Sequence, residues 1–300
     1  MSRNLSASIL ARLLTLAKER DDDYSLLLNR FALERLLLRI STSRHANRFL
    51  LKGALLFAIW YNDRHRPTRD ADLLGFGPDN AADLIATFRD IAAMDLGDGI
   101  MFEPDSIKAE AIREDNTYGG TRITMVARIG SARCALQIDV GFGDAVTPEP
   151  QTVVYPTLLK DFQAPTLRVY PVYTVIAEKY QAMVVLGQAN SRMKDFYDLA
   201  VIARRTGLEG AILAAAIAAT FARRKTPLPT VRPLALTRQF SEDPTKMRQW
   251  QAFLNRNRIT ASGLDDTVSL LGLMLWPPTE VAAANNQAAT TWHPELARWA

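Results

Sequence analysis

Five prolines between residues 148 and 171 divide this 300-residue sequence into two parts with different patterns. Before them, short apolar runs that look like strands alternate with helical segments. After them, apolar residues recur at the three-to-four-residue spacing of helices. The length is sufficient for one large domain or two modest ones. The change of pattern predicts two, with residues 1–170 forming an α+β domain and residues 171–300 a helical domain.

In the first part, two long amphipathic helices are expected to precede the strands. A Lys-Gly turn at residues 52–53 separates a short apolar strand from a third helix, and Asp79 or Asn80 can cap a fourth. The helices are predicted at residues 5–19, 24–41, 54–61 and from about 80 to 94. Strands are predicted at residues 49–51, 71–76, 106–113, 121–129 and 133–142.

In the second part, all the periodic segments read as helices. They are predicted at residues 174–186, 193–205, 208–221, 245–256 and about 263–275. The final stretch contains Pro277 and Pro278 followed by Ala, Asn, Gln and Thr. Because prolines interrupt helices and the composition is polar, we expect a tail there.

The composition excludes several classes of protein. A single cysteine, Cys134, cannot form an intrachain disulfide, and its apolar surroundings favour a buried thiol. Charged residues interrupt the amino-terminal segment, and no run approaches the roughly 18 apolar residues of a membrane span. A cytoplasmic protein is therefore expected. The net charge of +4 permits a polyanionic partner without requiring one.

Three aspartates form a candidate metal site. Asp70 and Asp72 are two residues apart on an expected strand, so both side chains project to one face. Asp139 lies among apolar residues on a later strand, where a carboxylate is costly to bury without a cationic partner. Hard divalent ions bind oxygen ligands, and transfer of a nucleotide uses two such ions about 3.5–4 Å apart. The alternative is an ordinary set of solvated aspartates at strand ends.

The Lys52-Gly53 turn weakens that alternative. It lies one helix before the aspartate pair, so it can face the same site, where backbone N–H groups suit an anionic phosphate. Arg69, next to Asp70, has two possible roles. It can bind the triphosphate group of a nucleotide substrate, or it can neutralise the carboxylates when no metal is bound.

Two blocks of sequence resemble the AbiEii/AbiGii-type nucleotidyltransferase family. The first is Phe-Leu-Leu-Lys-Gly-Ala-Leu-Leu at residues 49–56, followed by Arg-Pro-Thr-Arg-Asp-Ala-Asp-Leu at residues 66–73. The second is Ala-Glu-Lys at residues 177–179, followed by Arg-Met-Lys-Asp-Phe-Tyr-Asp-Leu at residues 192–199. The family includes the toxins of type IV toxin–antitoxin systems and belongs to the polymerase-beta-like superfamily. Ala54 departs from the glycine or serine common there, which removes one possible phosphate contact.

The resemblance implies a mixed sheet flanked by helices, with an appended helical domain. It also implies that Lys179 and Asp198 are active-site residues, with Lys179 contacting the triphosphate and Asp198 orienting it. Lys52, Gly53 and Arg69 would join Lys179 in binding the nucleotide. Asp70, Asp72 and Asp139 would hold two Mg²⁺ or Mn²⁺ ions, and Asp139 would help to activate the acceptor.

Two further groups have competing interpretations. Lys194 and Asp195 either belong to the site or form an ordinary ion pair on a helix. The basic stretch at residues 223–258, which includes Trp250 and Phe253, either binds RNA or is a solvated face over a core stripe. Phe196 and Tyr197 are expected to pack rather than to stack on bases.

The resemblance implies transfer of a nucleotide from an NTP to an acceptor hydroxyl, with a tRNA 3′ end as the expected acceptor. The protein would then be the monomeric toxin of a type IV pair, with a cognate antitoxin encoded nearby. Two alternatives remain open at this point. One is an enzyme that modifies a protein or small-molecule hydroxyl, and the other is a non-catalytic RNA-binding module on the same fold.

Overall fold

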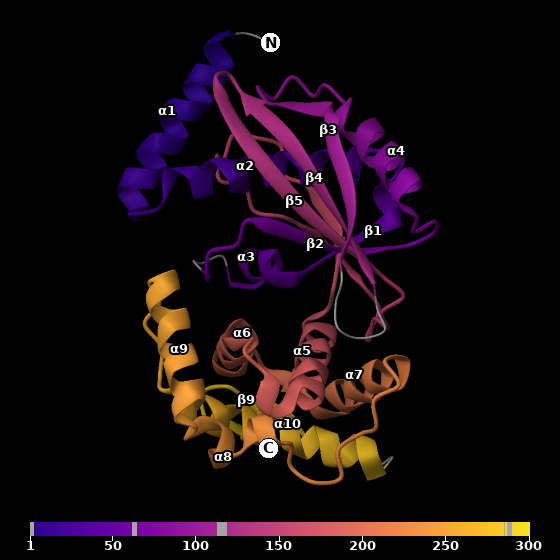
Figure 1. The fold of residues 1–300 in the computed structure, drawn as a ribbon, viewed down its shortest axis with the longest axis vertical. Helices are drawn as coiled ribbons and strands as arrows, with labels where there is room; N and C mark the ends of the chain where they lie inside the picture. Colours follow the sequence, from indigo (N-terminus) through magenta and orange to yellow (C-terminus); the bar gives the residue numbers. More distant parts are fainter. Residues whose placement is uncertain (1–2, 62–64, 113–118, 285, 287–289) are drawn as a thin grey trace. The chain divides into compact units, whose positions relative to one another are not determined.

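A computed structural model describes residues 3–61, 65–112, 119–284, 286 and 290–300 of the chain. These residues form two compact units (Figure 1). The first consists of Met1–Gly143 and Pro150–Tyr170, and the second of Asp144–Glu149 and Pro171–Ala300. The predicted mixed sheet flanked by helices, followed by a helical region, is confirmed. That each part folds as an independent domain stays a prediction.

The first unit is built on a seven-stranded mixed sheet with the order β3-β4-β5-β2-β1-β7-β6. Its strands are β1 (Phe49–Lys52), β2 (Asp70–Gly75), β3 (Met101–Ile112), β4 (Gly120–Ile129), β5 (Ala132–Phe142), β6 (Gln151–Val154) and β7 (Thr166–Val169). The β2–β5 and β1–β7 pairs are parallel, and the other neighbours run antiparallel. β2 therefore lies in the interior of the sheet, with β5 on one side and β1 on the other.

Helices α1 (Arg3–Arg20), α2 (Tyr24–Thr42), α3 (Leu56–Tyr61) and α4 (Ala81–Ala92) complete this unit, with 3₁₀ turns at Ala46–Arg48 and Gly53–Leu55. α2 packs against β5 and β7, and α4 packs against β3. Asp23 caps α2 by accepting a hydrogen bond from the Leu26 amide, and Asn80 caps α4 in the same way. Of the two predicted caps for α4, the structure uses Asn80.

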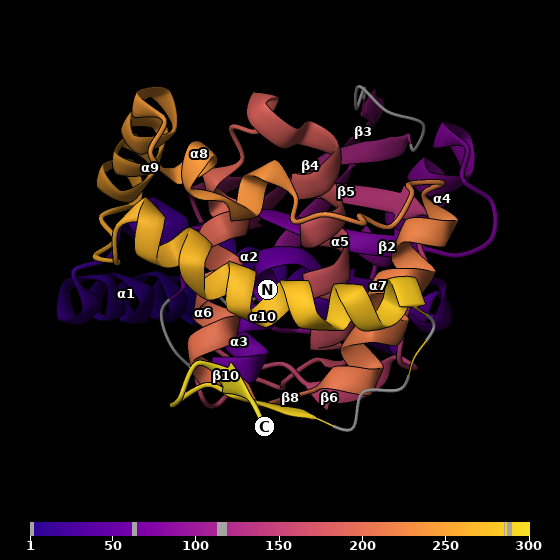
Figure 2. The same ribbon diagram turned by 90° about the horizontal axis from the view of Figure 1, so that it is seen from below.

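The second unit is mainly helical. It contains α5 (Val172–Leu186), α6 (Met193–Arg205), α7 (Gly210–Arg223), α8 (Arg238–Ser241), α9 (Pro244–Asn257) and α10 (Leu264–Ala284), with 3₁₀ turns at Gly187–Ala189 and Leu234–Leu236. Figure 2 shows α10 lying across α6 and α7, which it contacts. A small sheet of order β10-β9-β8 joins β8 (Leu208–Glu209), β9 (Thr291–His293) and β10 (Arg298–Trp299).

The expectation of a tail after residue 275 was wrong. α10 continues through Pro277 and Pro278 to Ala284. A proline costs a helix about 3 kcal/mol, but here Pro278 and Thr279 are buried, and tertiary packing offsets that cost. The following residues form β9 and β10, where Trp292 is fully buried and donates a hydrogen bond to the Ala203 carbonyl.

Other elements were also not predicted, among them α8 and β8 in the second unit. The proline-rich passage contains β6 and β7, which pair with each other at one edge of the sheet. β3 begins at Met101, earlier than the predicted residue 106, and its register shifts between Glu103 and Lys108. That shift interrupts the alternation of apolar and polar residues by which a strand is recognised in a sequence. Arg113, the last residue of the predicted strand, lies outside the described residues.

Several smaller predictions are confirmed. Cys134 is a buried free thiol, and burial raises its pKa. Phe196 is fully buried and stacks on Phe240. Among the described residues, the helices are either too short or too polar to cross a membrane.

Candidate active site

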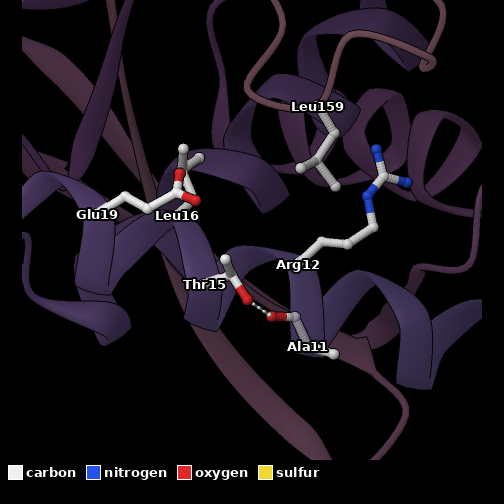
Figure 3. Close-up of a pocket in the computed structure, with 6 residues that line it drawn as sticks. All are labelled: Ala11, Arg12, Thr15, Leu16, Glu19 and Leu159. Atoms are coloured by element: carbon white, nitrogen blue, oxygen red, sulfur yellow. Dashed lines mark hydrogen bonds between the residues drawn. The ribbon is translucent and has the colours of Figure 1, made fainter.

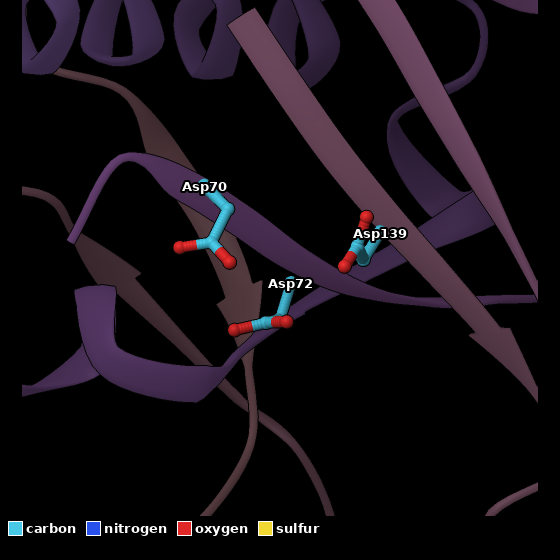
Figure 4. Close-up of side chains that lie close together, drawn as sticks. All are labelled: Asp70, Asp72 and Asp139. Atoms are coloured by element: carbon cyan, nitrogen blue, oxygen red, sulfur yellow. The ribbon is translucent and has the colours of Figure 1, made fainter. Parts of the chain in front are cut away.

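Asp70, Asp72 and Asp139 come together at the centre of the sheet. Asp72 on β2 and Asp139 on β5 are register partners in the parallel pair, and Asp70 is two residues away on β2. One carboxylate oxygen from each residue lies within 4.8 Å of the other two (Figure 4). The buried residues Ala71 and Leu73 alternate with the aspartates, so the strand turns its apolar side chains to the core and both carboxylates to the opposite face.

A row of charged residues crosses five strands of the sheet. Glu110 on β3 lies opposite Arg122 on β4, which lies opposite Asp139 on β5. Asp139 lies opposite Asp72, and Asp72 lies opposite Lys52 on β1. Side chains directly opposite one another share a face of the sheet. The acidic triad therefore has a cationic residue on the neighbouring strand at either side.

Arg122 binds Asp139 at two points. Its Nε donates to one carboxylate oxygen at 2.9 Å, and its Nη2 donates to the other at 2.8 Å. The pKa of the Arg122 guanidinium is raised by this hydrogen bonding to Asp139. Attraction to Asp139, Asp70 and Glu110 also raises it, and together these effects outweigh desolvation. Arg69, the arginine expected near the carboxylates, is exposed.

Gly53 approaches Asp72 so closely that no side chain fits between them. Its φ is +75°, in the left-handed region, and a Cβ placed on it would lie 1.9 Å from the Asp72 Oδ2 atom. The adjacent Lys52 carries its ammonium group 5.6 Å from the centre of the Tyr170 ring. The helix expected at residues 54–61 begins as the 3₁₀ turn Gly53–Leu55 and continues as the short α3.

Thr68 positions Asp70. Its hydroxyl lies 2.7 Å from Asp70 Oδ1 and can donate a hydrogen bond to it. Because a carboxylate accepts hydrogen bonds only, this contact restricts the rotation of the Asp70 side chain. Thr68 belongs to the block that resembles the nucleotidyltransferase family, but the sequence alone assigned it no role.

These three carboxylates are suited to a divalent metal ion. They offer several oxygen ligands at short mutual distances, which is what Mg²⁺ and Mn²⁺ require. The groups that touch the triad also fit this use: Thr68 and Arg122 each orient one carboxylate from outside.

In the second unit, Lys179 lies between two buried aspartates. Its Nζ is 2.6 Å from an oxygen of Asp195 and 2.8 Å from an oxygen of Asp198. Arg192 binds the second oxygen of Asp195 at 2.8 Å. The resemblance implied an active-site role for Asp198 and left the role of Asp195 open. In the structure, Lys179 forms an ion pair with each of them.

Charge pairing decides the pKa values in this cluster. Burial alone would lower the pKa of Lys179, but attraction to Asp195 and Asp198 outweighs it and raises the pKa. Burial alone would raise the pKa of Asp195, but Lys179 and Arg192 lower it. Lys194, which lies on α6 next to Asp195, is exposed. The triad, Lys52, Gly53 and Arg69 belong to the first unit, and Lys179 and Asp198 belong to the second.

Part of the basic stretch at residues 223–258 has a structural role. Lys246 is buried and donates to the Asn190 carbonyl. Trp250 is buried and donates to the Ser262 carbonyl, and Phe253 packs between Trp250 and Tyr197. These contacts favour the core-stripe interpretation for the two aromatic residues. RNA binding by the remaining basic residues stays a prediction.

A hollow of about 310 Å³ lies elsewhere on the first unit (Figure 3). α1 and Leu159 line it, with Arg12, Thr15 and Glu19 as the polar residues. The Thr15 hydroxyl already donates to the Ala11 carbonyl, and Arg12 forms an ion pair with Asp161. None of the three aspartates lines this hollow, so it is separate from the candidate active site.

Besides Thr68, sequence reasoning also gave no role to Arg122. It lies in a predicted strand, but its partner depends on the register between β4 and β5. A charged residue within an otherwise apolar strand is a weak signal of such a pair. Asp139 carried the same signal and was recognised because a third carboxylate was expected.

Two solved structures resemble the fold. The crystal structure of a putative nucleotidyltransferase from H. pylori has a TM-score of 0.51 and 14% identity, covering 89% of this chain and 100% of that chain. The structure of JHP933 from Helicobacter pylori has a TM-score of 0.48 and 13% identity, covering 88% of this chain and 94% of that one. At this identity the first likeness supports the fold alone, and no curated protein matches the chain.

A family model provides the stronger comparison. The model described as nucleotidyl transferase AbiEii toxin, type IV TA system, matches residues 35–267. This range includes the aspartate triad, Gly53, Arg122 and the Lys179 cluster. The chain therefore belongs to the AbiEii family of nucleotidyltransferase toxins from type IV toxin–antitoxin systems.

Proposed function

We propose that this enzyme uses divalent metal ions to transfer a nucleotide from an NTP to the 3′-terminal hydroxyl of a tRNA. The observation that carries the proposal is the convergence of Asp70, Asp72 and Asp139 beside Gly53. Family membership supplies the nucleotidyltransferase activity and the toxin class. The metal and the acceptor are the parts that we add.

The reaction forms one P–O bond and breaks another, and the acceptor hydroxyl loses its proton to solvent. The acceptor hydroxyl oxygen attacks the α-phosphorus of the NTP, and the bond from that phosphorus to the bridging oxygen breaks to release pyrophosphate. Two Mg²⁺ or Mn²⁺ ions, when bound, would stabilise charge on the attacking and leaving oxygens. Asp70 and Asp72 would hold both ions. Asp139 would complete the site and help to activate the hydroxyl.

Other residues would bind the triphosphate. Gly53, whose backbone lies against the Asp72 side chain, is our candidate for a backbone contact with a phosphate. Lys52, opposite Asp72 on β1, adds a positive charge. Arg69 is exposed and can contribute a guanidinium. Lys179 is our further candidate for triphosphate binding, and Asp198 for the residue that orients its ammonium group.

The expected setting follows from the substrates. NTPs and tRNA are abundant in the cytoplasm, and we propose that the chain acts there as a monomer. Membership of a type IV toxin family implies a cognate antitoxin. A small DNA-binding antitoxin encoded by the neighbouring reading frame would support the biological assignment.

Labelled nucleotides provide the direct test. The purified chain is incubated with Mg²⁺ or Mn²⁺, total tRNA and each of the four α-labelled NTPs, and the RNA is separated on a denaturing gel. We expect label on tRNA with at least one NTP, and loss of that label with Asp72→Asn. No transfer with any NTP would refute the proposal. Labelling of RNase-treated lysate would instead indicate a protein or small-molecule acceptor.

A further inference from the structure

Arg122 makes a contact with the acidic triad that metal coordination alone does not explain. It is 39% exposed, so its own burial does not require a partner. Nevertheless, its guanidinium binds both oxygens of Asp139, which is only 18% exposed. The two residues are direct register partners on antiparallel strands. The pair is therefore built into the sheet rather than formed by two flexible surface side chains.

A two-point contact fixes more than a distance. The terminal torsion of an aspartate is broad, so a single hydrogen bond restricts the rotation of the carboxylate less than two hydrogen bonds do. Two parallel N–H···O bonds from a planar guanidinium define the plane of the carboxylate. Each oxygen has roughly two lone-pair sites and uses one of them to accept from Arg122, so sites remain for a metal ion.

The charges allow Arg122 and a metal ion to be present together. The three aspartates carry three negative charges, which one guanidinium and one divalent ion neutralise between them. Glu110 and Lys52, at the two ends of the row, have opposite charges, so together they do not change this balance. A first ion can thus bind without displacing Arg122 from Asp139.

We infer that Arg122 is a positioning residue, which holds the Asp139 carboxylate in the orientation that binds metal together with Asp70 and Asp72. This inference rests on the proposed function, because it requires the triad to bind a divalent ion. Such outer partners of ligating carboxylates typically contribute 10–100-fold to metal affinity or activity. The contact also explains why an arginine rather than a lysine stands here, since an ammonium group cannot make the planar two-point contact.

The experiment measures Mn²⁺ binding without nucleotide or turnover. Free Mn²⁺ is titrated against the full chain by electron paramagnetic resonance, with wild type, Arg122→Lys and Arg122→Gln compared. We expect both variants to bind Mn²⁺ about 10–100-fold more weakly. Arg122→Lys keeps the positive charge, so its defect would show that geometry is the contribution of Arg122.

Arg128→Gln is the matched control. Arg128 lies on the same strand, is 43% exposed and forms an ion pair with Glu103, outside the triad. We expect its Mn²⁺ affinity to stay within about twofold of wild type, because surface ion pairs contribute little. Thermal unfolding of each variant shows whether it is folded.

A second comparison tests whether Arg122 acts through Asp139. In an Asp139→Asn background, Arg122→Lys should cause no further loss of Mn²⁺ affinity, because the carboxylate that it orients has been removed. This comparison stays informative even if one variant is less stable, because the double and single variants share the same background.

Each contrary result has a distinct meaning. Wild-type affinity in Arg122→Lys would show that only charge matters, and tighter binding in Arg122→Gln would show that Arg122 competes with the metal. A further loss in the Asp139→Asn background would show that Arg122 acts elsewhere. Any of these overturns the inference and leaves the metal site intact. Absence of Asp72-dependent Mn²⁺ binding in wild type would instead refute the proposed function, and the inference with it.

Discussion

Asp72 and Asp139 stand directly opposite each other on adjacent parallel strands, although β3 and β4 separate their strands along the chain. The sheet order brings β5 next to β2, and the register sets the two carboxylates level. Asp70, two residues along β2, adds the third oxygen ligand. Three like charges at this separation repel one another, so the arrangement is stable only with cations close by.

Replacing Asp72 with asparagine should separate catalysis from folding. We expect nucleotide transfer to fall by at least about 100-fold, since removal of even an outer partner of a metal ligand costs 10–100-fold. Without metal, the variant should be as stable as wild type or more so, because one repulsive charge is removed. Thermal unfolding with and without Mn²⁺ checks this. When free Mn²⁺ is at 100 times its Kd, the free energy of unfolding of wild type should rise by about 2.7 kcal/mol. That of the variant should rise less. A fully active variant would contradict the metal assignment.

Gly53→Ala should damage the site by steric contact. The new Cβ would overlap Asp72 Oδ2, and displacement of a reacting group by about 1 Å can cost roughly 100-fold in rate. Gly77→Ala is the control, because Gly77 also has a positive φ of +82°, but a Cβ placed on it would meet no other atom within 4 Å. Both variants should lose about 1–2 kcal/mol from backbone strain. Equal transfer rates in the two variants would argue against the close approach of Gly53.

Thr68→Val removes the hydroxyl that contacts Asp70 while preserving the shape of the side chain. We expect nucleotide transfer to fall about tenfold, within the range for outer partners of metal ligands. Thr68→Ser, which keeps a hydroxyl, should retain most of the rate. Steady-state rates of nucleotide transfer at saturating Mg²⁺ provide the measurement. Equal rates for Thr68→Val and wild type would show that the Thr68 hydroxyl has no role in the reaction.

Lys179→Met should destabilise the second unit strongly. It leaves Asp195 and Asp198, which are 1% and 0% exposed, without the ammonium group that binds both. Loss of one partner from a buried ion pair typically costs about 3–5 kcal/mol. Lys194→Met, at an exposed position on α6, should change the free energy of unfolding by less than about 0.5 kcal/mol. Urea denaturation measures both, and similar losses would show that the buried pairs do not stabilise the unit.

Acid should weaken the contribution of Asp195 to the stability of the fold. Its pKa is lowered by Lys179 and Arg192 despite burial, so its folded-state pKa lies below the usual value of about 4. A depressed carboxylate pKa stabilises the fold above the unfolded-state pKa, and this stabilisation is lost as pH falls through the folded-state value. The difference in unfolding free energy between wild type and Asp195→Asn should therefore narrow below about pH 4. A constant difference between pH 7 and pH 2 would contradict this linkage.

The sequence predicted the carboxylates better than their surroundings. Alternation on β2 places Asp70 and Asp72 on one face, and this follows from local sequence alone. Asp139 was identified because a third carboxylate was expected and because a charge among apolar residues is costly without a partner. The contact of Arg122 with Asp139 depends on which residues lie opposite across β4 and β5, and a shift of one residue would turn Arg122 to the other face of the sheet. Local patterns do not encode that register.

The missed elements have a similar explanation. β6 and β7 are four residues each and are stabilised by pairing rather than by a periodic pattern of their own. The helix predicted at about residues 263–275 is α10, but its two prolines argue locally against the continuation to Ala284, which is maintained by the contacts of α10 with α6 and α7. In both cases tertiary contacts outweighed local propensity.

The sheet order has a consequence for synthesis of the protein. Because β5 supplies Asp139 and pairs directly with β2, the acidic triad cannot assemble until the ribosome has released the chain beyond Phe142. β2 emerges much earlier but has neither its neighbour nor its third carboxylate. A nascent chain therefore lacks the complete triad while its first strands are being made, and nucleotide transfer that depends on the triad can begin only after most of the first unit has left the exit tunnel.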